Sequence, residues 1–108
     1  SGLLAAEEHL AELLLFDNPR LLGRIADRRL AALEPLTPKS RQRLAKTALA
    51  YVQERGNAAA MARSLRVHPQ TARYRVAQLR ELLGEQLDQV DGRFELELAL
   101  RARGVSLS

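Results

Sequence analysis

The chain has no cysteine, no tryptophan and only four other aromatic residues. The lack of cysteine excludes disulfide bridges and thiolate zinc sites, and is compatible with a reducing cytoplasm, where we expect the protein to be located. The two histidines are far apart in sequence and no glycine-rich phosphate loop is present, so we expect neither a metal nor a cofactor. No apolar run approaches the roughly 18 residues that span a bilayer, and no signal peptide is visible, so we expect no membrane partner.

Leucine, alanine, arginine and glutamate are abundant, and 46% of the residues are apolar. This composition, with few aromatic residues and few glycines, is typical of all-α proteins. A length of 108 residues is enough for one small domain with a modest core and a helical arm. Ser1-Gly2 is typical of a cloning remnant, so we expect the chain to be a piece of a longer protein.

Leucine spacing and helix-start signals define an N-terminal arm. The positions from Leu3 to Phe16 follow a helical pattern, and Asp17-Asn18-Pro19 predicts a cap and the first turn of a second helix. That helix stops near Pro35. We predict a leucine-rich helical arm at residues 1–36. Since it is too apolar to stand alone, we expect it to pack on a second copy of the chain and form a homodimer.

A third helix begins at Thr37-Pro38, where the cap-then-proline signal recurs, and runs to about Arg55. Gly56 can then take the left-handed conformation that ends helices. Because further helices follow directly, we predict that residues 37–108 form one domain.

The stretch from Asn57 to Leu83 predicts two helices joined by one tight turn. Asn57 is a good N-cap for the helix formers that follow it, and Pro69 is tolerated where the second helix begins. Helical spacing gives each helix an apolar face, formed by Ala58, Met61, Ala62 and Leu65 and by Ala72, Val76, Leu79 and Leu83. The opposite face of the second helix carries Gln70, Arg73, Tyr74, Ala77 and Arg80.

Positive charge is concentrated on this pair. Residues 55–80 contain six arginines and no acidic residue, a local charge of +6, whereas residues 1–54 sum to +1 and residues 81–108 to −3. DNA phosphates attract such a patch whatever the base sequence. Helices paired in this way can place the second one, the recognition helix at about residues 69–83, in the major groove of DNA.

Individual roles follow from position on the recognition helix. Three side chains point away from its apolar face in the first turns, and we predict that they reach base edges: Gln70, Arg73 and Tyr74. Four others flank that row and are candidates for phosphate contacts: Asn57, Arg66, Thr71 and Arg75. Capping alone would also explain Asn57. His68 can cap the recognition helix or meet a phosphate, and we favour the cap.

Gly84 is predicted to stop the recognition helix, and the tail beyond it has two interpretations. The segment RFELELAL alternates like a strand, with Asp91-Gly92 as a hairpin turn, which would make a winged helix. Alternatively, Asp91 caps a helix across residues 91–103. We favour the helix, because Glu, Leu, Ala and Arg favour that state and little chain is available for a partner strand. Tyr51 and Phe94 are predicted core aromatics.

These segments resemble the C-terminal helix-turn-helix domain of PucR-type bacterial transcription regulators, which include purine-catabolism and sugar-diacid regulators. The similarity lies in TALAYVQERGNAAAMARSLRVHPQTARYRVAQLRELLG at 47–84 and RFELELAL at 93–100. It implies an all-α helical bundle containing a Fis-like helix-turn-helix, a helical tail, and effector sensing by domains upstream. The family usually has Arg then Asn after His68, whereas this chain has Pro69 and Gln70, so we expect an altered operator.

Two classes of function therefore compete. The first is sequence-specific binding of double-stranded DNA by a bacterial regulator, as a dimer. The second is a helical protein-interaction module that binds RNA polymerase, for example, through the same arginines. Loss of protein binding without loss of DNA retention, after Arg73 and Arg75 are changed, would favour the second class. We do not expect an enzyme, because Glu7, Glu8 and Glu12 have no basic or nucleophilic group arranged with them.

Overall fold

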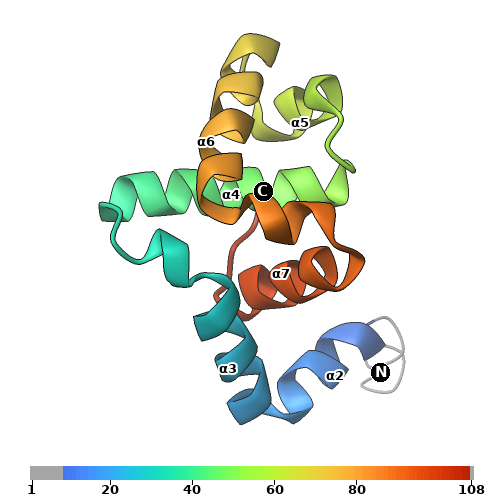
Figure 1. The fold of residues 1–108 in the computed structure, drawn as a ribbon. Coiled ribbons are helices and arrows are strands. Elements are labelled where there is room, and N and C mark those ends of the chain that lie inside the picture. Colours follow the sequence, from blue (N-terminus) through green and yellow to red (C-terminus); the bar gives the residue numbers. More distant parts are fainter. Residues whose placement is uncertain (1–8, 108) are drawn as a thin grey trace.

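The computed structural model describes residues 9–107, and within that range every regular element is helical (Figure 1). The elements in order are α2 Leu10–Asp17, α3 Pro19–Arg29, a 3-10 turn Ala31–Leu33, α4 Pro38–Gln53, α5 Ala58–Leu65, α6 Pro69–Asp88 and α7 Val90–Ala102. The predicted all-α class is confirmed. The predicted helical positions from Leu3 to Glu8 lie outside the described residues. No described helix combines the length and the apolar character needed to cross a membrane.

The predicted helix starts are confirmed by side-chain caps. Asn18, Thr37 and Asn57 each accept a hydrogen bond from the backbone N–H three residues later, at 3.1, 3.2 and 2.9 Å. Pro19 and Pro38 occupy the first turns of α3 and α4, where a missing N–H has no cost. Each such cap contributes about 0.5–2 kcal/mol to stability. The sequence therefore sets where three of the helices begin.

One apolar core joins α3, α4, α6 and α7. Its fully buried leucines include Leu79, Leu83 and Leu87 from α6 and Leu96 and Leu100 from α7. Burial of each leucine side chain contributes about 1.5–3 kcal/mol. α3 packs along α7, and it supplies Ala26 to the same core, with Leu30 and Leu33 following it. The core therefore draws on residues from both sides of position 36.

The predicted end of the recognition helix at Gly84 is wrong, since α6 continues to Asp88. Glycine inside a helix costs about 1 kcal/mol relative to alanine. Continuing the helix buries Leu87, which is 1% exposed, and brings the Gln86 amide to 3.1 Å from the Arg29 carbonyl oxygen. Burial of the leucine outweighs the cost of the glycine.

The tail forms helix α7, so the helical interpretation is confirmed and the wing is wrong. Asp91 is not the cap: Gln89 takes that position, and Asp91 lies in the first turn, where its charge interacts favourably with the helix dipole. Phe94 is not a core residue, because it is 63% exposed. It precedes buried Leu96 by two positions, and two positions correspond to about 200° around a helix, so the two side chains leave on opposite faces.

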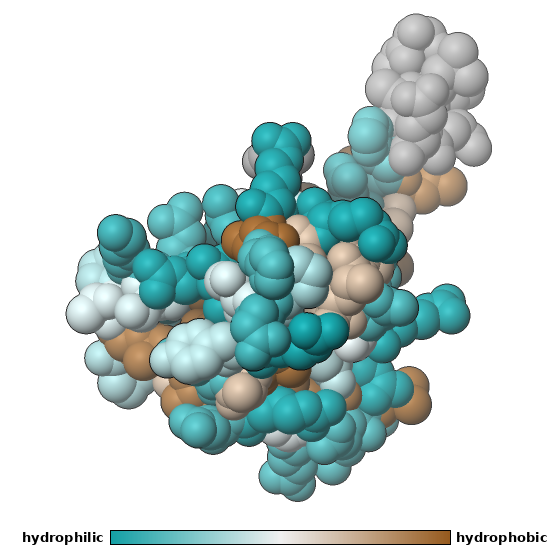
Figure 2. Space-filling model, turned by 90° about the horizontal axis from the view of Figure 1, so that it is seen from above, coloured by the Kyte–Doolittle hydropathy of each residue, from teal (hydrophilic) through white to brown (hydrophobic). Residues whose placement is uncertain are grey.

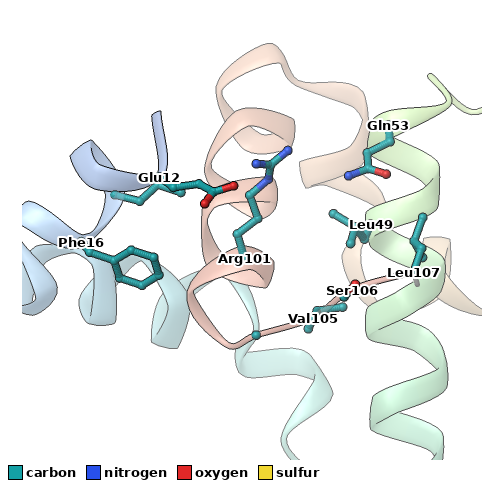
Figure 3. Close-up of a pocket in the computed structure, with 10 residues that line it drawn as sticks. Glu12, Phe16, Leu49, Gln53, Arg101, Val105, Ser106 and Leu107 are labelled. Atoms are coloured by element: carbon teal, nitrogen blue, oxygen red, sulfur yellow. The ribbon is translucent and has the colours of Figure 1, made fainter. Parts of the chain in front are cut away.

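α2 differs from the other helices because none of its residues is buried. Leu10, Leu13, Leu14 and Phe16 are all more than half exposed. A cavity of about 520 Å³ separates α2 from α4, α7 and the C-terminal segment (Figure 3). Glu12 of α2 and Arg101 of α7 point toward one another beside this cavity. α2 therefore adds no buried residue to the core, and four of its apolar side chains lie largely in solvent.

Candidate nucleic-acid interface

The α5–turn–α6 unit forms the upper end of the molecule in Figure 1. Met61 and Ala62 of α5 are buried, at 0% and 4% exposure. Arg66 takes a left-handed conformation (φ 58°), and the Val67 N–H donates to the carbonyl oxygen of Ala62 at 3.0 Å. A left-handed non-glycine residue costs about 1–2 kcal/mol, which the surrounding packing must offset. The turn that follows α5 is thereby closed within three residues, as predicted.

His68 caps the recognition helix. Its Nδ1 accepts a hydrogen bond from the backbone N–H of Gln70 at 3.1 Å, and Pro69 occupies the first helical position. The capping interpretation of His68 is confirmed. Neither α5 nor α6 has an acidic residue in its first turn. The positive dipole end of each helix is therefore not neutralised by a carboxylate of its own first turn.

The three predicted base-reading residues share the outer face of α6. Gln70, Arg73 and Tyr74 are all exposed, and the Tyr74 side chain is 65% exposed. The Arg73 guanidinium donates to the Gln70 side-chain oxygen at 3.3 Å. Seen from above, this end of the molecule is mainly hydrophilic, with small apolar areas between the polar side chains (Figure 2). The arrangement brings together a cation, an amide and a phenol on one exposed helix face.

Arg80 lies on the same face of α6 but is held by the protein. It donates to the Tyr51 hydroxyl at 2.7 Å and to Asp88 at 3.1 Å, and its guanidinium lies 5.6 Å from the centre of the Tyr51 ring. The hydrogen bond to Asp88 and the proximity of Tyr51 raise the pKa of Arg80 above its ordinary value. Arg80 therefore joins the C-terminal half of α6 to α4. Tyr51, predicted as a core aromatic, is partly buried against the core.

The four predicted phosphate-contact residues lie at the start of α5, in the turn and on α6. Asn57 and Arg66 are exposed, at the start of α5 and in the turn. Thr71 and Arg75 are half-buried on α6. Asn57 uses its side-chain oxygen to cap α5, so its amide group has one acceptor already engaged.

A basic cluster on α4 was missed by sequence reasoning. Lys39, Arg43 and Lys46 line a cavity of about 320 Å³ together with Arg75 of α6. We call these four residues the α4 cationic cleft. The charges of residues 1–54 nearly cancel when summed over that whole segment, which concealed the cluster. Spacings of four and three residues on one predicted helix were the signal that could have revealed it.

Metal binding has no support in the part of the chain that the structure describes. Across residues 9–107, no three or more His, Asp and Glu side chains are grouped so that they could hold a metal ion. The cavity between α2 and α7 is lined by apolar side chains and by the polar residues Glu12, Gln53, Arg101 and Ser106, and its lining helices lie away from the N-terminal end of α6.

Comparisons with known proteins agree with this geometry. The family described as the PucR C-terminal helix-turn-helix domain matches residues 44–102, a range that contains α5, α6 and α7 and most of α4. Neither the curated proteins nor the solved structures give a significant match. Since the match covers more than half of the 108 residues and includes the complete helix pair, the chain belongs to the PucR C-terminal helix-turn-helix family.

Proposed function

We propose that this chain is a sequence-specific binding domain for double-stranded DNA, from a bacterial transcription regulator. The N-terminal half of α6 enters the major groove. The observation that carries the proposal is the exposed row of Gln70, Arg73 and Tyr74 at the N-terminal end of a helix whose first turn has no acidic residue. Helix-turn-helix proteins read base edges with this part of their second helix.

In this proposal, Gln70, Arg73 and Tyr74 contact the base edges. A glutamine can form two hydrogen bonds with adenine, and an arginine can do so with guanine, each pair giving about 1–3 kcal/mol of discrimination. Tyr74 is placed to contact a neighbouring base or a thymine methyl group. Arg80 is left out of this row, since Tyr51 and Asp88 already hold its guanidinium.

The predicted phosphate-contact residues bind the DNA backbone in this proposal. Arg66 in the turn and Arg75 on the side of α6 supply charge, while Asn57 and Thr71 supply polar groups near the start of α5 and α6. Contacts of this kind fix the orientation of the protein on the duplex and carry no direct sequence information. Residues 37–108 constitute the DNA-binding unit in this proposal.

The arm, residues 1–36, serves as the dimerisation element. Helix α2 exposes leucines and a phenylalanine that a monomer leaves in water, and a large exposed apolar patch usually marks an interaction surface. The α2 helix of a second copy has the same apolar surface, so two α2 helices can bury each other's exposed side chains and no other protein is needed. A single short helix contacts few base pairs. Two-fold pairing of the chains doubles the number of base contacts.

We propose that this chain does not itself sense the effector. Effector sensing belongs to domains upstream of the DNA-binding unit, and the regulator works in the bacterial cytoplasm, where the chromosome lies. No catalytic role is assigned. Pro69 and Gln70, where this chain departs from the usual family pattern, are expected to give this protein an operator of its own. Both residues lie in the first turn of α6, close to where bases would be read.

The test is binding of the chain to random genomic fragments and to the promoter next to its own gene, as a function of salt. We expect a preferred promoter, with affinity that falls as salt rises. Arg73→Ala should reduce the preference by about 1–3 kcal/mol and keep the weaker, sequence-independent binding. Arg28→Ala, which removes an exposed arginine from α3, is the matched control and should leave the preference intact. Absence of DNA binding at low salt would refute the proposal.

A further inference from the structure

The α4 cationic cleft brings three basic residues of α4, none of them part of the predicted interface, beside Arg75. Lys39, Arg43 and Lys46 lie four and three residues apart on α4, and Arg75 of α6 completes the cavity wall. Its other lining residues are Gln42 and Leu65, so no carboxylate lines it. None of the four cations forms an ion pair with another residue in the described range. Glu81 lines the neighbouring cavity on the other side of Arg43 but makes no ion pair with it.

The proximity of these cations is electrostatically unfavourable in the protein without a bound anion. Like charges four residues apart on a helix repel each other, as Lys39 and Arg43 do. Lys39 also lies in the first turn of α4, which has no acidic residue and where the helix dipole disfavours a cation. Lys46 and Arg75 are half-buried, so water screens their charges less completely. An anion bound in the cleft would remove these unfavourable interactions.

The position of the cleft identifies the anion. Arg75 belongs both to the cleft and to the residues that flank the reading face of α6. Leu65, on the same cavity wall, directly precedes Arg66 in the turn. The cleft is therefore continuous with the side of α6 that faces the backbone of a bound duplex. DNA presents its phosphates on both sides of the major groove, next to any helix that enters it.

We propose that the α4 cationic cleft binds backbone phosphates of the DNA duplex beside the groove that α6 enters. The proposal rests on the DNA-binding function above and adds a third helix to the contact surface. In this arrangement α6 reads bases, α5 and the turn hold one part of the backbone, and α4 holds another. The cleft contributes affinity for every DNA sequence and no preference among sequences.

The test measures the salt dependence of binding to a short random-sequence duplex and to the preferred promoter. Each phosphate contact contributes about 0.9 to the slope of log affinity against log salt. Combined replacement Lys39→Gln, Arg43→Gln and Lys46→Gln should lower the slope by roughly 2–3, equally for both duplexes. Lys39→Gln alone, at an exposed position, should lower it by about 0.9 without risk to folding. Lys39→Arg with Lys46→Arg should leave the slope unchanged.

A matched control removes the same charge elsewhere. Arg20, Arg24 and Arg28 are exposed on α3, at the opposite end of the molecule from the start of α6 (Figure 1). Their combined replacement by Gln should change the slope much less than the α4 variant does. An equal effect of the two triple variants, or an unchanged slope for the α4 variant, would overturn the cleft and leave the DNA-binding function standing. Failure of the unmodified chain to bind either duplex would overturn both.

Discussion

The guanidinium of Arg73 donates a hydrogen bond to the side-chain oxygen of Gln70, one helical turn earlier, at 3.3 Å. Both residues are exposed on α6. The contact aligns the two side chains that we expect to read neighbouring bases, so that each restricts the other before DNA arrives. Their effects on recognition should therefore be coupled.

This coupling can be measured with a double-mutant cycle. We expect Gln70→Ala and Arg73→Ala each to reduce the preference for the operator over random DNA by about 1–3 kcal/mol. The double variant should lose less than the sum of the two single losses, because residues in contact are not independent. Competition binding with operator and random duplexes gives the four free energies. Strict additivity would show that the two side chains act separately.

Tyr51 and Arg80 provide a test of how α6 is held. Tyr51→Phe removes the hydroxyl that accepts the 2.7 Å hydrogen bond, and keeps the ring beneath the guanidinium. Since Arg80 is 44% exposed, we expect a loss of stability of only about 0.5–1 kcal/mol. Urea unfolding measures it. Operator preference should be unchanged, and a change in preference at constant stability would instead place Tyr51 or Arg80 in the reading surface.

Two glycines should respond to alanine with opposite signs. A Cβ at Gly92 would lie 2.6 Å from the Gln86 carbonyl oxygen and 2.9 Å from its Cα, so Gly92→Ala must displace backbone at the corner between α6 and α7. We expect a loss of about 1–3 kcal/mol. At Gly84 a Cβ meets nothing within 4 Å, and helix propensity predicts a gain of about 0.5–1 kcal/mol for Gly84→Ala. Thermal unfolding of both variants measures the two changes in stability. A Gly92→Ala protein as stable as the unmodified chain would contradict the close approach of Gly92 to Gln86.

Local signals in the sequence predicted the local structure. The caps at Asn18, Thr37 and Asn57 and the closed turn before Pro69 depend on residues within a few positions of each other, so they were readable from the chain alone. The outward face of α6 was also predictable, because helical periodicity separates its apolar and polar positions.

Features that depend on distant partners were not predictable in this way. α6 continues through Gly84 because Leu87 is buried in the core. The residues that bury it are distant in sequence, so the local pattern around Gly84 does not predict this stabilisation. Phe94 is exposed because α7 presents its leucines to α3, which lies more than sixty positions earlier. Similarly, Arg75 and the basic residues of α4 line one cavity only once the helices cross.

The exposed surface of α2 makes the dimer testable. Leu14 is 76% exposed, so Leu14→Gln removes apolar surface from α2 and should leave the fold of one chain intact. We expect the variant to be monomeric at concentrations where the unmodified chain is dimeric, as measured by light scattering. Its affinity for a two-fold operator should fall, whereas its affinity for a single half-site should not, because each recognition helix is unaltered.

Val90→Gln is the matched control for this experiment. Val90 is 71% exposed at the start of α7, outside the arm, so the replacement has a similar effect on exposed apolar surface and should leave the dimer in place. If both variants weakened association equally, the interface would extend over α7, and α2 alone would not account for it. A monomeric unmodified chain at high concentration would contradict a dimer through the arm.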